Sequence, residues 1–398
     1  MDIKIYPGKL SGTVSVNSSK SQAHRLLICA AFSDKPTVLL CKDTSQDIEA
    51  TVSCLNALGA SISRTNTGYY VVPVKTVPTS AELDCNESGA TLRFILPIVC
   101  ALGIHAKLHM SGRLSDRPLS PLLEELTRMG CSIDRTAANI IQTSGKLSPG
   151  RYFIPGNVSS QFVTGLLFAL SLLDGKSSIR IEGNLESKPY VDITKAAMSL
   201  FGVKVDGLSV TGSFPYTSPG IVNIEGDWSN AAFFLVAEAL GSDITVHNLE
   251  TNSLQGDRII TEILKHSDTM PTISAADIPD LIPVLSVFFA ANHGVVFTDI
   301  ARLRHKESDR VASIVEMLCS LGIYAVSDKN SLTVHHGKIT GGVVNSHNDH
   351  RIAMAASIAA TIATGPVTIC DAHCVAKSYP AFWQDFSRLG GKYEQYLR

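Results

Sequence analysis

Positively charged side chains gather at the predicted starts of helices along this chain. Lys20 and Arg25 lie in the polar cluster SSKSQAHR (18–25), and Arg351 lies in HNDHR (347–351), each beside a long apolar run. A cation is mildly unfavourable at a helix N-terminus, because the macrodipole is already positive there. Repeated cations at such positions therefore predict a bound anion, such as a phosphate or a carboxylate.

A second group of cations shows the same bias. Arg117, Lys188, Lys306, Arg310 and Lys377 lie at or just before the predicted starts of other helices, and prolines are expected in the first turns (Pro118, Pro189, Pro380). The alternative is that the polar clusters only cap helices beside ordinary surface charge. Capping explains Ser159, Asp227 and Asp349. A cap does not require a cation next to it, so the pattern favours anion sites.

Three carboxylates accompany these cations, namely Asp47, Asp280 and Glu307. A carboxylate among cations is suited to general acid or base chemistry, with a pKa set by burial and neighbouring charge. Simpler interpretations stay open. Asp280 in ADIPD (276–280) has the position of a helix N-cap, and Glu307 with Arg310 has the spacing of a surface i,i+3 ion pair.

Other chemistries lack their motifs. The chain has no GxxxxGK[ST] loop, no GxGxxG after a strand and no GxSxG turn. His347, Asp349 and His350 lack the spacing of zinc ligands, so no metal and no cofactor are predicted. The formal net charge of −2 gives no basic field for nucleic acid or an anionic membrane. The longest uncharged stretch, residues 353–370, is interrupted by Gly365-Pro366, and we expect a buried helix followed by a strand.

A repeat organises the 398 residues. Amphipathic helices end in a glycine before a strand at LNALGASI (55–62), LTRMGCSI (126–133), MSLFGVKV (198–205), MLCSLGIYAV (317–326) and FSRLGGKY (386–393), with a weaker copy at 262–270 where Ser267 or Asp268 would replace the glycine. They alternate with apolar helices that open with the polar clusters, also found at 86–93, 157–162 and 226–232. Six strand–helix units predict two domains of three units each.

The order of the motifs resembles the 5-enolpyruvylshikimate-3-phosphate synthase family. SKSQAHR, SGATLR, SDRP, SSQF, SKPYVDIT, IPD, KESDR, NDHR and AKSYP follow one another over residues 20–380. The resemblance implies a two-domain inside-out α/β barrel built from six βαβαββ units. It implies a C-terminal-type domain of residues 1–13 plus 226–398, an N-terminal-type domain of residues 14–225, and an active-site cleft between them.

The resemblance also implies an activity. Members of this family move the enolpyruvyl group of phosphoenolpyruvate onto the 5-hydroxyl of shikimate 3-phosphate in the shikimate pathway, through a tetrahedral intermediate and without a metal. The expected partners are these two small molecules, with no nucleic acid and no membrane. Nine scattered cysteines and a start without an apolar export signal predict a reducing, cytoplasmic location, and a monomer is expected.

The family's functional residues map onto this chain by motif. The implied shikimate 3-phosphate ligands are Lys20, Ser21, Arg25, Ser159, Ser160, Gln161, Ser187, Tyr190, Asp280 and Lys306. The implied phosphoenolpyruvate ligands are Lys20, Gly89, Arg117, Gln161, Arg310, Arg351 and Lys377. Asp280 is the implied base for the 5-hydroxyl, and Glu307 with Lys20 or Lys377 is implied in proton transfer at the enol carbon.

The chain departs from the family pattern near the expected phosphoenolpyruvate pocket. VNSSKS has Asn17-Ser18-Ser19 where Pro-Gly-Ser is usual, NESGAT has Ala90 where a hydroxyl residue is common, and Phe94 and Arg302 replace a frequent Pro and a frequent Asn. Affinity for phosphoenolpyruvate and the response to glyphosate are the properties these changes affect. The two alternatives are another enolpyruvyl transferase with a different acceptor and a non-catalytic binder of phosphorylated metabolites.

Overall fold

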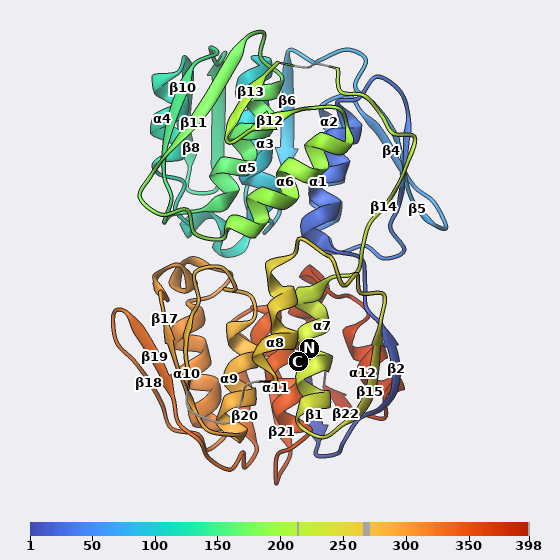
Figure 1. Ribbon diagram of the computed structural model, residues 1–398, viewed down its shortest axis with the longest axis vertical. Coiled ribbons are helices and arrows are strands. Elements are labelled where there is room, and N and C mark those ends of the chain that lie inside the picture. The colour runs from blue at the N-terminus through green and yellow to red at the C-terminus, as the bar shows by residue number, and fades with distance from the viewer. Residues whose placement is uncertain (213–214, 266–270, 397–398) are drawn as a thin grey trace. The chain divides into compact units, whose positions relative to one another are not determined.

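The chain forms two compact units with separate hydrophobic cores. The computed structural model describes residues 1–212, 215–265 and 271–396 (Figure 1). One unit is Ser18–Glu225, here the N-terminal unit, and the other joins Met1–Asn17 to Gly226–Arg398, here the C-terminal unit. The sequence analysis placed these divisions after residues 13 and 225. Each unit buries its own set of aliphatic and aromatic side chains, and the whole is a two-domain α/β protein.

Three four-stranded sheets lie in the N-terminal unit, in the orders β14-β3-β5-β4, β6-β7-β9-β8 and β10-β11-β13-β12. In each sheet the first two strands are parallel and the remaining neighbours are antiparallel. The strands are β3 (Thr37–Leu40), β4 (Ser61–Arg64), β5 (Gly68–Val72), β6 (Ser80–Asp84), β7 (His105–His109), β8 (Cys131–Ala137), β9 (Ile140–Gly145), β10 (Arg151–Pro155), β11 (Lys176–Glu182), β12 (Val205–Asp206), β13 (Ser209–Thr211) and β14 (Ile221–Asn223).

The C-terminal unit repeats this plan. Its two four-stranded sheets have the orders β16-β17-β19-β18 and β20-β21-β1-β22, again with one parallel and two antiparallel pairings, and β15 pairs with β2 in parallel. The strands are β1 (Asp2–Tyr6), β2 (Ser11–Ser15), β15 (Asp243–His247), β16 (Thr272–Ser274), β17 (Val295–Thr298), β18 (Ala325–Ser327), β19 (Ser331–Val334), β20 (Gly342–Asn345), β21 (Val367–Cys370) and β22 (Lys392–Tyr396). The opening strand β1 therefore belongs with the end of the chain.

Two kinds of helix alternate along the sequence, as the repeat predicts. The almost fully buried helices are α1 (Lys20–Ala31), α3 (Gly89–Leu102), α5 (Ser160–Ser171), α7 (Trp228–Ala239), α9 (Ile282–Ala291) and α11 (His350–Ala360). The more exposed helices are α2 (Gln46–Ala57), α4 (Leu122–Arg128), α6 (Lys188–Leu200), α8 (Ile260–Ile263), α10 (Arg310–Ser320) and α12 (Phe382–Arg388), and four 3₁₀ turns precede α4, α8, α10 and α12 at Gly112–Asp116, Gly256–Ile259, Ala301–His305 and Ala372–Lys377.

Helix packing within a unit brings helix starts together. In the N-terminal unit α1 packs on α2 and α6, and α3 packs on α5 (Figure 1). Gly165 of α5 faces the backbone of α3 so closely that a Cβ there would lie 2.1 Å from the carbonyl oxygen of Arg93. Because only glycine permits this approach, Gly165 sets the distance between the starts of two helices that carry predicted site residues.

The predicted glycine stops are confirmed. Gly59, Gly130, Gly202, Gly322 and Gly390 follow α2, α4, α6, α10 and α12, and all five have positive φ. The proposed replacement at Ser267 or Asp268 lies outside the described residues.

Helix capping is confirmed at three predicted caps. Ser159, Asp227 and Asp349 are the N-cap residues of α5, α7 and α11, and each side chain accepts a backbone N–H. The capping interpretation of Asp280 is wrong, since α9 starts later, after Leu281, without a side-chain cap. Pro189 lies in the first turn of α6, whereas Pro118 and Pro380 precede α4 and α12.

The uncharged stretch 353–370 forms most of α11 and then β21, as the sequence predicts. No helix within the described ranges has the length and apolar character needed to cross a membrane.

Candidate active site

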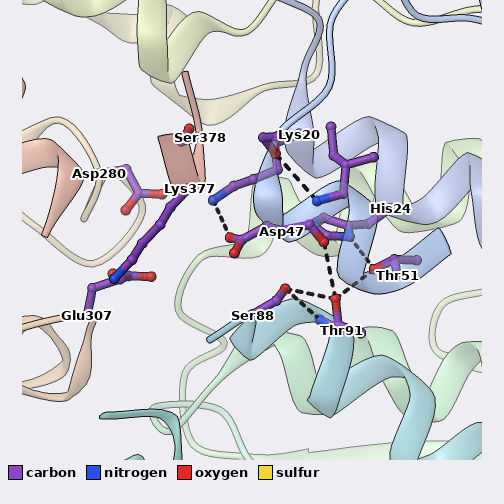
Figure 2. A network of polar contacts seen from close by, with 12 residues as sticks. Lys20, His24, Asp47, Thr51, Ser88, Thr91, Asp280, Glu307, Lys377 and Ser378 are labelled. Atoms are coloured by element: carbon purple, nitrogen blue, oxygen red, sulfur yellow. Dashed lines mark hydrogen bonds and ion pairs between the residues drawn. The ribbon is translucent and has the colours of Figure 1, made fainter. Parts of the chain in front are cut away.

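An ion pair joins the starts of α1 and α2 in the N-terminal unit. Lys20 is the first residue of α1, after the N-cap Ser19, and Asp47 lies in the first turn of α2, after the N-cap Ser45. Lys20 Nζ lies 2.8 Å from Asp47 Oδ2, and the two side chains are 15% and 14% exposed (Figure 2). The ammonium group of Lys20 is thus held by a carboxylate, and the side chain stays partly exposed. A lysine that binds an incoming anion needs such access.

Arg25 lies one turn further along α1 and is buried. Its guanidinium donates to the hydroxyls of Thr194 (2.7 Å) and Thr164 (3.4 Å) and to the carbonyls of Ser21 (2.6 Å) and Tyr190 (3.0 Å). Burial lowers the pKa of Arg25 to about 10, so it remains charged near neutral pH. These bonds tie α1 to α5 and α6, and they place the predicted ligands Ser21, Arg25 and Tyr190 in one cluster.

Two arginines converge on the start of α3. Arg93 Nη1 donates to Gln161 Oε1 (3.2 Å), and its Nη2 donates to the carbonyl of Pro118 (3.0 Å), so Arg93 links α3 to α5 and to the segment before α4. A Cβ at Gly89 would lie 2.6 Å from Nη1 of Arg93 and 2.7 Å from Nη1 of Arg117. The predicted ligands Gly89, Arg117 and Gln161 are therefore neighbours, around Arg93, the last residue of the SGATLR motif, which was not predicted to be a ligand.

The predicted serine ligands lie at two helix starts. Ser159 caps α5 by accepting the N–H of Gln161 (3.2 Å), and Ser160 is the buried first residue of that helix. Ser187 precedes α6 in a left-handed conformation, with φ 54° and ψ 39°, and its carbonyl accepts the N–H of Tyr190 (3.1 Å). A left-handed serine is uncommon, so its conformation is held by the surrounding structure.

In the C-terminal unit Arg310 joins three carboxylates. Its Nε donates to Asp349 (2.8 Å), its Nη1 to Asp280 (2.5 Å) and its Nη2 to Glu307 (2.6 Å). The Arg310 side chain is only 1% exposed, so the interpretation of Glu307 and Arg310 as a surface pair is wrong. The three carboxylates raise the pKa of Arg310 well above its usual value despite its burial. Arg310 thereby fixes the two carboxylates that were predicted to act as acid or base.

Asp280 receives three cations. Besides Arg310, Arg351 Nε lies 3.2 Å from Asp280 Oδ1, and Lys306 Nζ lies 3.9 Å from the same oxygen. Burial alone would raise the pKa of Asp280, but Arg351, Lys306 and Arg310 outweigh it and hold the pKa well below its usual value. Burial lowers the pKa of Lys306 to about 8, so this lysine can gain or lose a proton close to neutral pH.

Lys377 ends the 3₁₀ turn before α12 and is buried. Its Nζ donates to the carbonyl of Asn348 (2.7 Å), in the left-handed turn that precedes the cap of α11. The next residue, Ser378, accepts from Asn17 through its carbonyl (3.0 Å), and Asn17 Oδ1 accepts from Asn230 (3.1 Å). Asn17, a departure from the family pattern, is thus part of the structure that holds the Lys377 segment.

Asp257 is a buried carboxyl beside this cluster that the sequence analysis did not select. It accepts a hydrogen bond from Ser229, whose carbonyl lies 3.5 Å from Arg351 Nη1. Burial and the nearby Asp280 raise the pKa of Asp257 from 3.8 to about 7, against the effect of Arg351. The SLQGD segment (253–257) therefore borders the charged cluster.

The raised pKa of Asp257 predicts a pH dependence of stability. Between pH 4 and 7 the folded protein binds more protons at this carboxyl than the unfolded chain does, so its contribution to the free energy of unfolding falls as pH rises through this window. Asp257→Asn removes the contribution. In urea unfolding, the variant should gain stability relative to the unaltered protein as pH rises from about 4 to about 7, and the difference should change little above about pH 8. A stability difference independent of pH would show that Asp257 has an ordinary pKa.

The two histidines of the HNDHR segment differ in their surroundings. His347 Nε2 lies 2.9 Å from Glu316, and His350 is buried at the start of α11. Within the ranges that the structure describes, no three His, Cys, Asp or Glu side chains are grouped so as to hold a metal ion.

Comparison with known proteins identifies the family of this chain. The model of the family described as EPSP synthase (3-phosphoshikimate 1-carboxyvinyltransferase) matches residues 5–270 and 265–386. This chain belongs to that family. A 3-phosphoshikimate 1-carboxyvinyltransferase of Clostridium kluyveri is 40% identical over an alignment that covers 99% of this chain and 98% of the relative. The family assigned from the sequence motifs is confirmed.

Solved structures share the fold. The EPSP synthase of Acinetobacter baumannii superposes with a TM-score of 0.80 at 25% identity, covering 99% of this chain and all of the other. The enolpyruvyl transferase NikO of Streptomyces tendae has a TM-score of 0.78 at 17% identity, over 99% and 98% of the two chains, and this likeness concerns the fold alone.

Proposed function

We propose that this member of the EPSP synthase family transfers the enolpyruvyl group of phosphoenolpyruvate to the 5-hydroxyl of shikimate 3-phosphate. The observation that carries the proposal is the 40% identity to a 3-phosphoshikimate 1-carboxyvinyltransferase across 99% of the chain. Two groups of cations support it, one with Lys20, Arg25 and Arg117 in the N-terminal unit and one with Lys306, Arg310 and Arg351 in the C-terminal unit. The reaction must bring two phosphates and a carboxylate together, and these cations can neutralise them. The pathway is the shikimate pathway, and the enzyme acts in the cytoplasm as a monomer.

The proposed reaction is an addition followed by an elimination. The oxygen of the 5-hydroxyl bonds to C2 of phosphoenolpyruvate and gives up its proton, while C3 gains a proton, which yields a tetrahedral ketal phosphate. The bond from C2 to the phosphate oxygen then breaks, C3 loses a proton, and phosphate leaves. Each step moves one proton at carbon, so positioned acid and base groups are required.

The C-terminal cluster is defined here as Asp280, Lys306, Glu307, Arg310, Asp349 and Arg351. In this proposal its carboxylates supply most of the groups that transfer protons. Asp280 accepts the proton of the 5-hydroxyl, and Glu307 with Lys20 or Lys377 handles the proton at C3. With three cations beside it the carboxylate of Asp280 is a weak base. When substrate anions draw Lys306, Arg310 and Arg351 toward themselves, this stabilisation decreases and the carboxylate becomes a better base.

The cations and hydroxyls divide between the substrates. Shikimate 3-phosphate is bound by Lys20, Ser21, Arg25, Ser159, Ser160, Gln161, Ser187, Tyr190, Asp280 and Lys306, and phosphoenolpyruvate is bound by Lys20, Gly89, Arg117, Gln161, Arg310, Arg351 and Lys377. A non-catalytic binder would have no use for the carboxylates Asp280 and Glu307, which repel anionic ligands.

The choice of acceptor tests this proposal. The purified protein is incubated with phosphoenolpyruvate and either shikimate 3-phosphate or UDP-N-acetylglucosamine, and phosphate release is followed. Release only with shikimate 3-phosphate supports the proposal. Release only with the nucleotide sugar would make the chain a different enolpyruvyl transferase, and release with neither would favour a binder.

Gly89→Ala is expected to weaken phosphoenolpyruvate binding. Gly89 has a helical backbone, so alanine fits its conformation, but the new methyl group would lie within 2.7 Å of guanidinium nitrogens of Arg93 and Arg117. The guanidinium groups of Arg93 and Arg117 must then shift away from the start of α3. We expect KM for phosphoenolpyruvate to rise roughly tenfold. Gly8→Ala, where no atom lies within 4 Å of the added Cβ, is the control. An unchanged KM in Gly89→Ala would remove Arg117 from the phosphoenolpyruvate site.

A further inference from the structure

A chain of buried polar side chains connects the starts of three helices in the N-terminal unit (Figure 2). His24 Nδ1 on α1 lies 2.7 Å from Thr51 Oγ1 on α2, and Thr51 Oγ1 lies 2.7 Å from Thr91 Oγ1 on α3. Thr91 Oγ1 also lies 2.8 Å from Ser88 Oγ and donates to the backbone carbonyl of Asp47 (3.4 Å). All four side chains are at most 1% exposed.

These hydrogen-bonded side chains join the helices that carry predicted substrate ligands. Helix α1 begins with Lys20, α2 carries Asp47 in its first turn, and α3 begins with Gly89. The 2.8 Å contact between Lys20 and Asp47 requires a fixed separation of α1 and α2. His24 and Thr51 bridge the same two helices, and Thr91 bridges from Thr51 to the carbonyl of Asp47 itself.

These hydrogen bonds are suited to holding the helices in place because His24 has one protonation state and one hydrogen-bonding ring atom available for the contact with α2. Burial, with help from the nearby Lys20 and Arg25, lowers the pKa of His24 well below its usual value, so the imidazole stays neutral. No hydrogen-bond partner of its Nε2 is present among the described residues, and the ring packs edge-on against Phe94 at a centroid distance of 6.3 Å. Nδ1 is thus the ring atom through which His24 holds α2, and a buried polar group that loses its partner carries a full desolvation cost.

We propose that His24, Thr51 and Thr91 are positioning residues that fix Lys20 and Asp47 relative to the start of α3, without touching substrate. For its kinetic consequence this inference rests on the proposed function, since Lys20 and Gly89 are ligands only if that function holds. Small displacements of reacting groups reduce turnover strongly. The hydrogen-bonded side chains of His24, Thr51 and Thr91 therefore affect the rate through Lys20 and Asp47.

The kinetic test compares two substitutions at one position. Thr51→Val keeps the shape of the side chain and removes the hydroxyl, whereas Thr51→Ser keeps the hydroxyl. Thr51→Val should lower kcat/KM for phosphoenolpyruvate roughly tenfold to a hundredfold, and Thr51→Ser should stay within about threefold of the unaltered protein. Thr143→Val is the matched control. Thr143 is a buried threonine of the same unit whose hydroxyl bonds to the backbone at Ile104 and Ala106, and its loss should affect stability but not kcat/KM.

Equal activity of Thr51→Val and Thr51→Ser, with both folded by circular dichroism, would overturn the proposal. So would an equal loss of activity in Thr143→Val, because the effect would then be general destabilisation.

A second measurement does not depend on transferase activity. Nitrogen-15 NMR of the histidine side chains, with His24 assigned by its absence in His24→Asn, reports the hydrogen bond at Nδ1. Thr91→Val, which reaches His24 only through Thr51, should shift the His24 Nδ1 resonance, and Thr143→Val should not. An unshifted resonance in Thr91→Val would show that the side chains do not act as one chain. If the unaltered protein lacked transferase activity while this shift occurred, the proposed function would fail and the structural connection would stand.

Discussion

Replacing Arg310 with methionine is expected to lower the free energy of unfolding by about 3–5 kcal/mol and to remove transferase activity. Methionine fills most of the volume but leaves Asp280, Glu307 and Asp349 without the cation that they share. Removing the shared charge partner of buried carboxylates is costly, even though Asp280 keeps Arg351 and Lys306, and two of these three carboxylates are the proposed acid and base groups. Urea unfolding followed by tryptophan fluorescence measures the stability, and phosphate release measures the activity.

Arg388→Met is the matched control. Arg388 also forms an i,i+3 ion pair, with Asp385, but its side chain is 67% exposed. Although Asp385 is buried, the Arg388 side chain lies largely in water, which screens the pair, so this substitution should cost about 1 kcal/mol or less and should leave activity unchanged. If Arg310→Met were as stable as Arg388→Met, Arg310 would not be the residue that organises the C-terminal cluster.

Lys20→Ala is expected to reduce kcat by roughly a hundredfold to ten thousandfold, the range for losing a positioned acid or base. The substitution removes the cation at the start of α1 and leaves Asp47 without its partner at 2.8 Å. Since both side chains are partly exposed, the loss of stability should be small, and the effect should appear in turnover. Steady-state kinetics with both substrates varied separates kcat from KM.

Lys107→Ala provides the comparison for Lys20. Lys107 forms an exposed pair with Glu82 at 3.3 Å in the same unit, and its loss should not change turnover. A Lys20→Ala protein with nearly normal kcat and a raised KM would make Lys20 a binding residue only, and Lys377 would then be the lysine that transfers the proton.

The architecture was largely predictable because its signals are local. A helix that ends at Gly59 or Gly322 needs a left-handed residue there, and the sequence pattern shows it directly. The apolar runs after Ser159 and Asp349 are hydrophobic on nearly every face, which predicts buried helices. In contrast, no local signal places the start of α4 after Pro121, because a 3₁₀ turn and an extended segment come before it.

The partners within the site were less predictable because they are distant in sequence. Arg310 bonds to Asp280, Glu307 and Asp349, which lie 30, 3 and 39 positions away. Only the pair with Glu307 follows from helical spacing, and spacing alone suggested an exposed pair. Burial of Arg310 depends on the packing of α9, α10 and α11 together. The same reason explains why Asp280 seemed to be a cap when its partners are cations from two later segments.

The roles of Arg93, Asp257 and His24 were not predicted, although Arg93 and His24 lie within the quoted motifs SGATLR and SKSQAHR. Arg93 lies one helical turn after Gly89, so the i,i+4 spacing could have placed its guanidinium at the start of α3. Asp257 and His24 lack such a signal. Asp257 is notable only for its burial next to Arg351 and Asp280, and His24 only for its contact with a threonine of another helix. Both properties arise from tertiary packing.

In the proposed reaction this enzyme forms a bond between C2 of phosphoenolpyruvate and the 5-oxygen of shikimate 3-phosphate. Carbon-13 NMR of phosphoenolpyruvate labelled at C2, incubated with shikimate 3-phosphate and the protein, observes that carbon directly. We predict that its signal disappears and a new enol ether signal, coupled to H5 of the shikimate ring, grows in step with free phosphate. Labelled pyruvate with phosphate, or an unchanged phosphoenolpyruvate signal, would show that the protein does not form this bond.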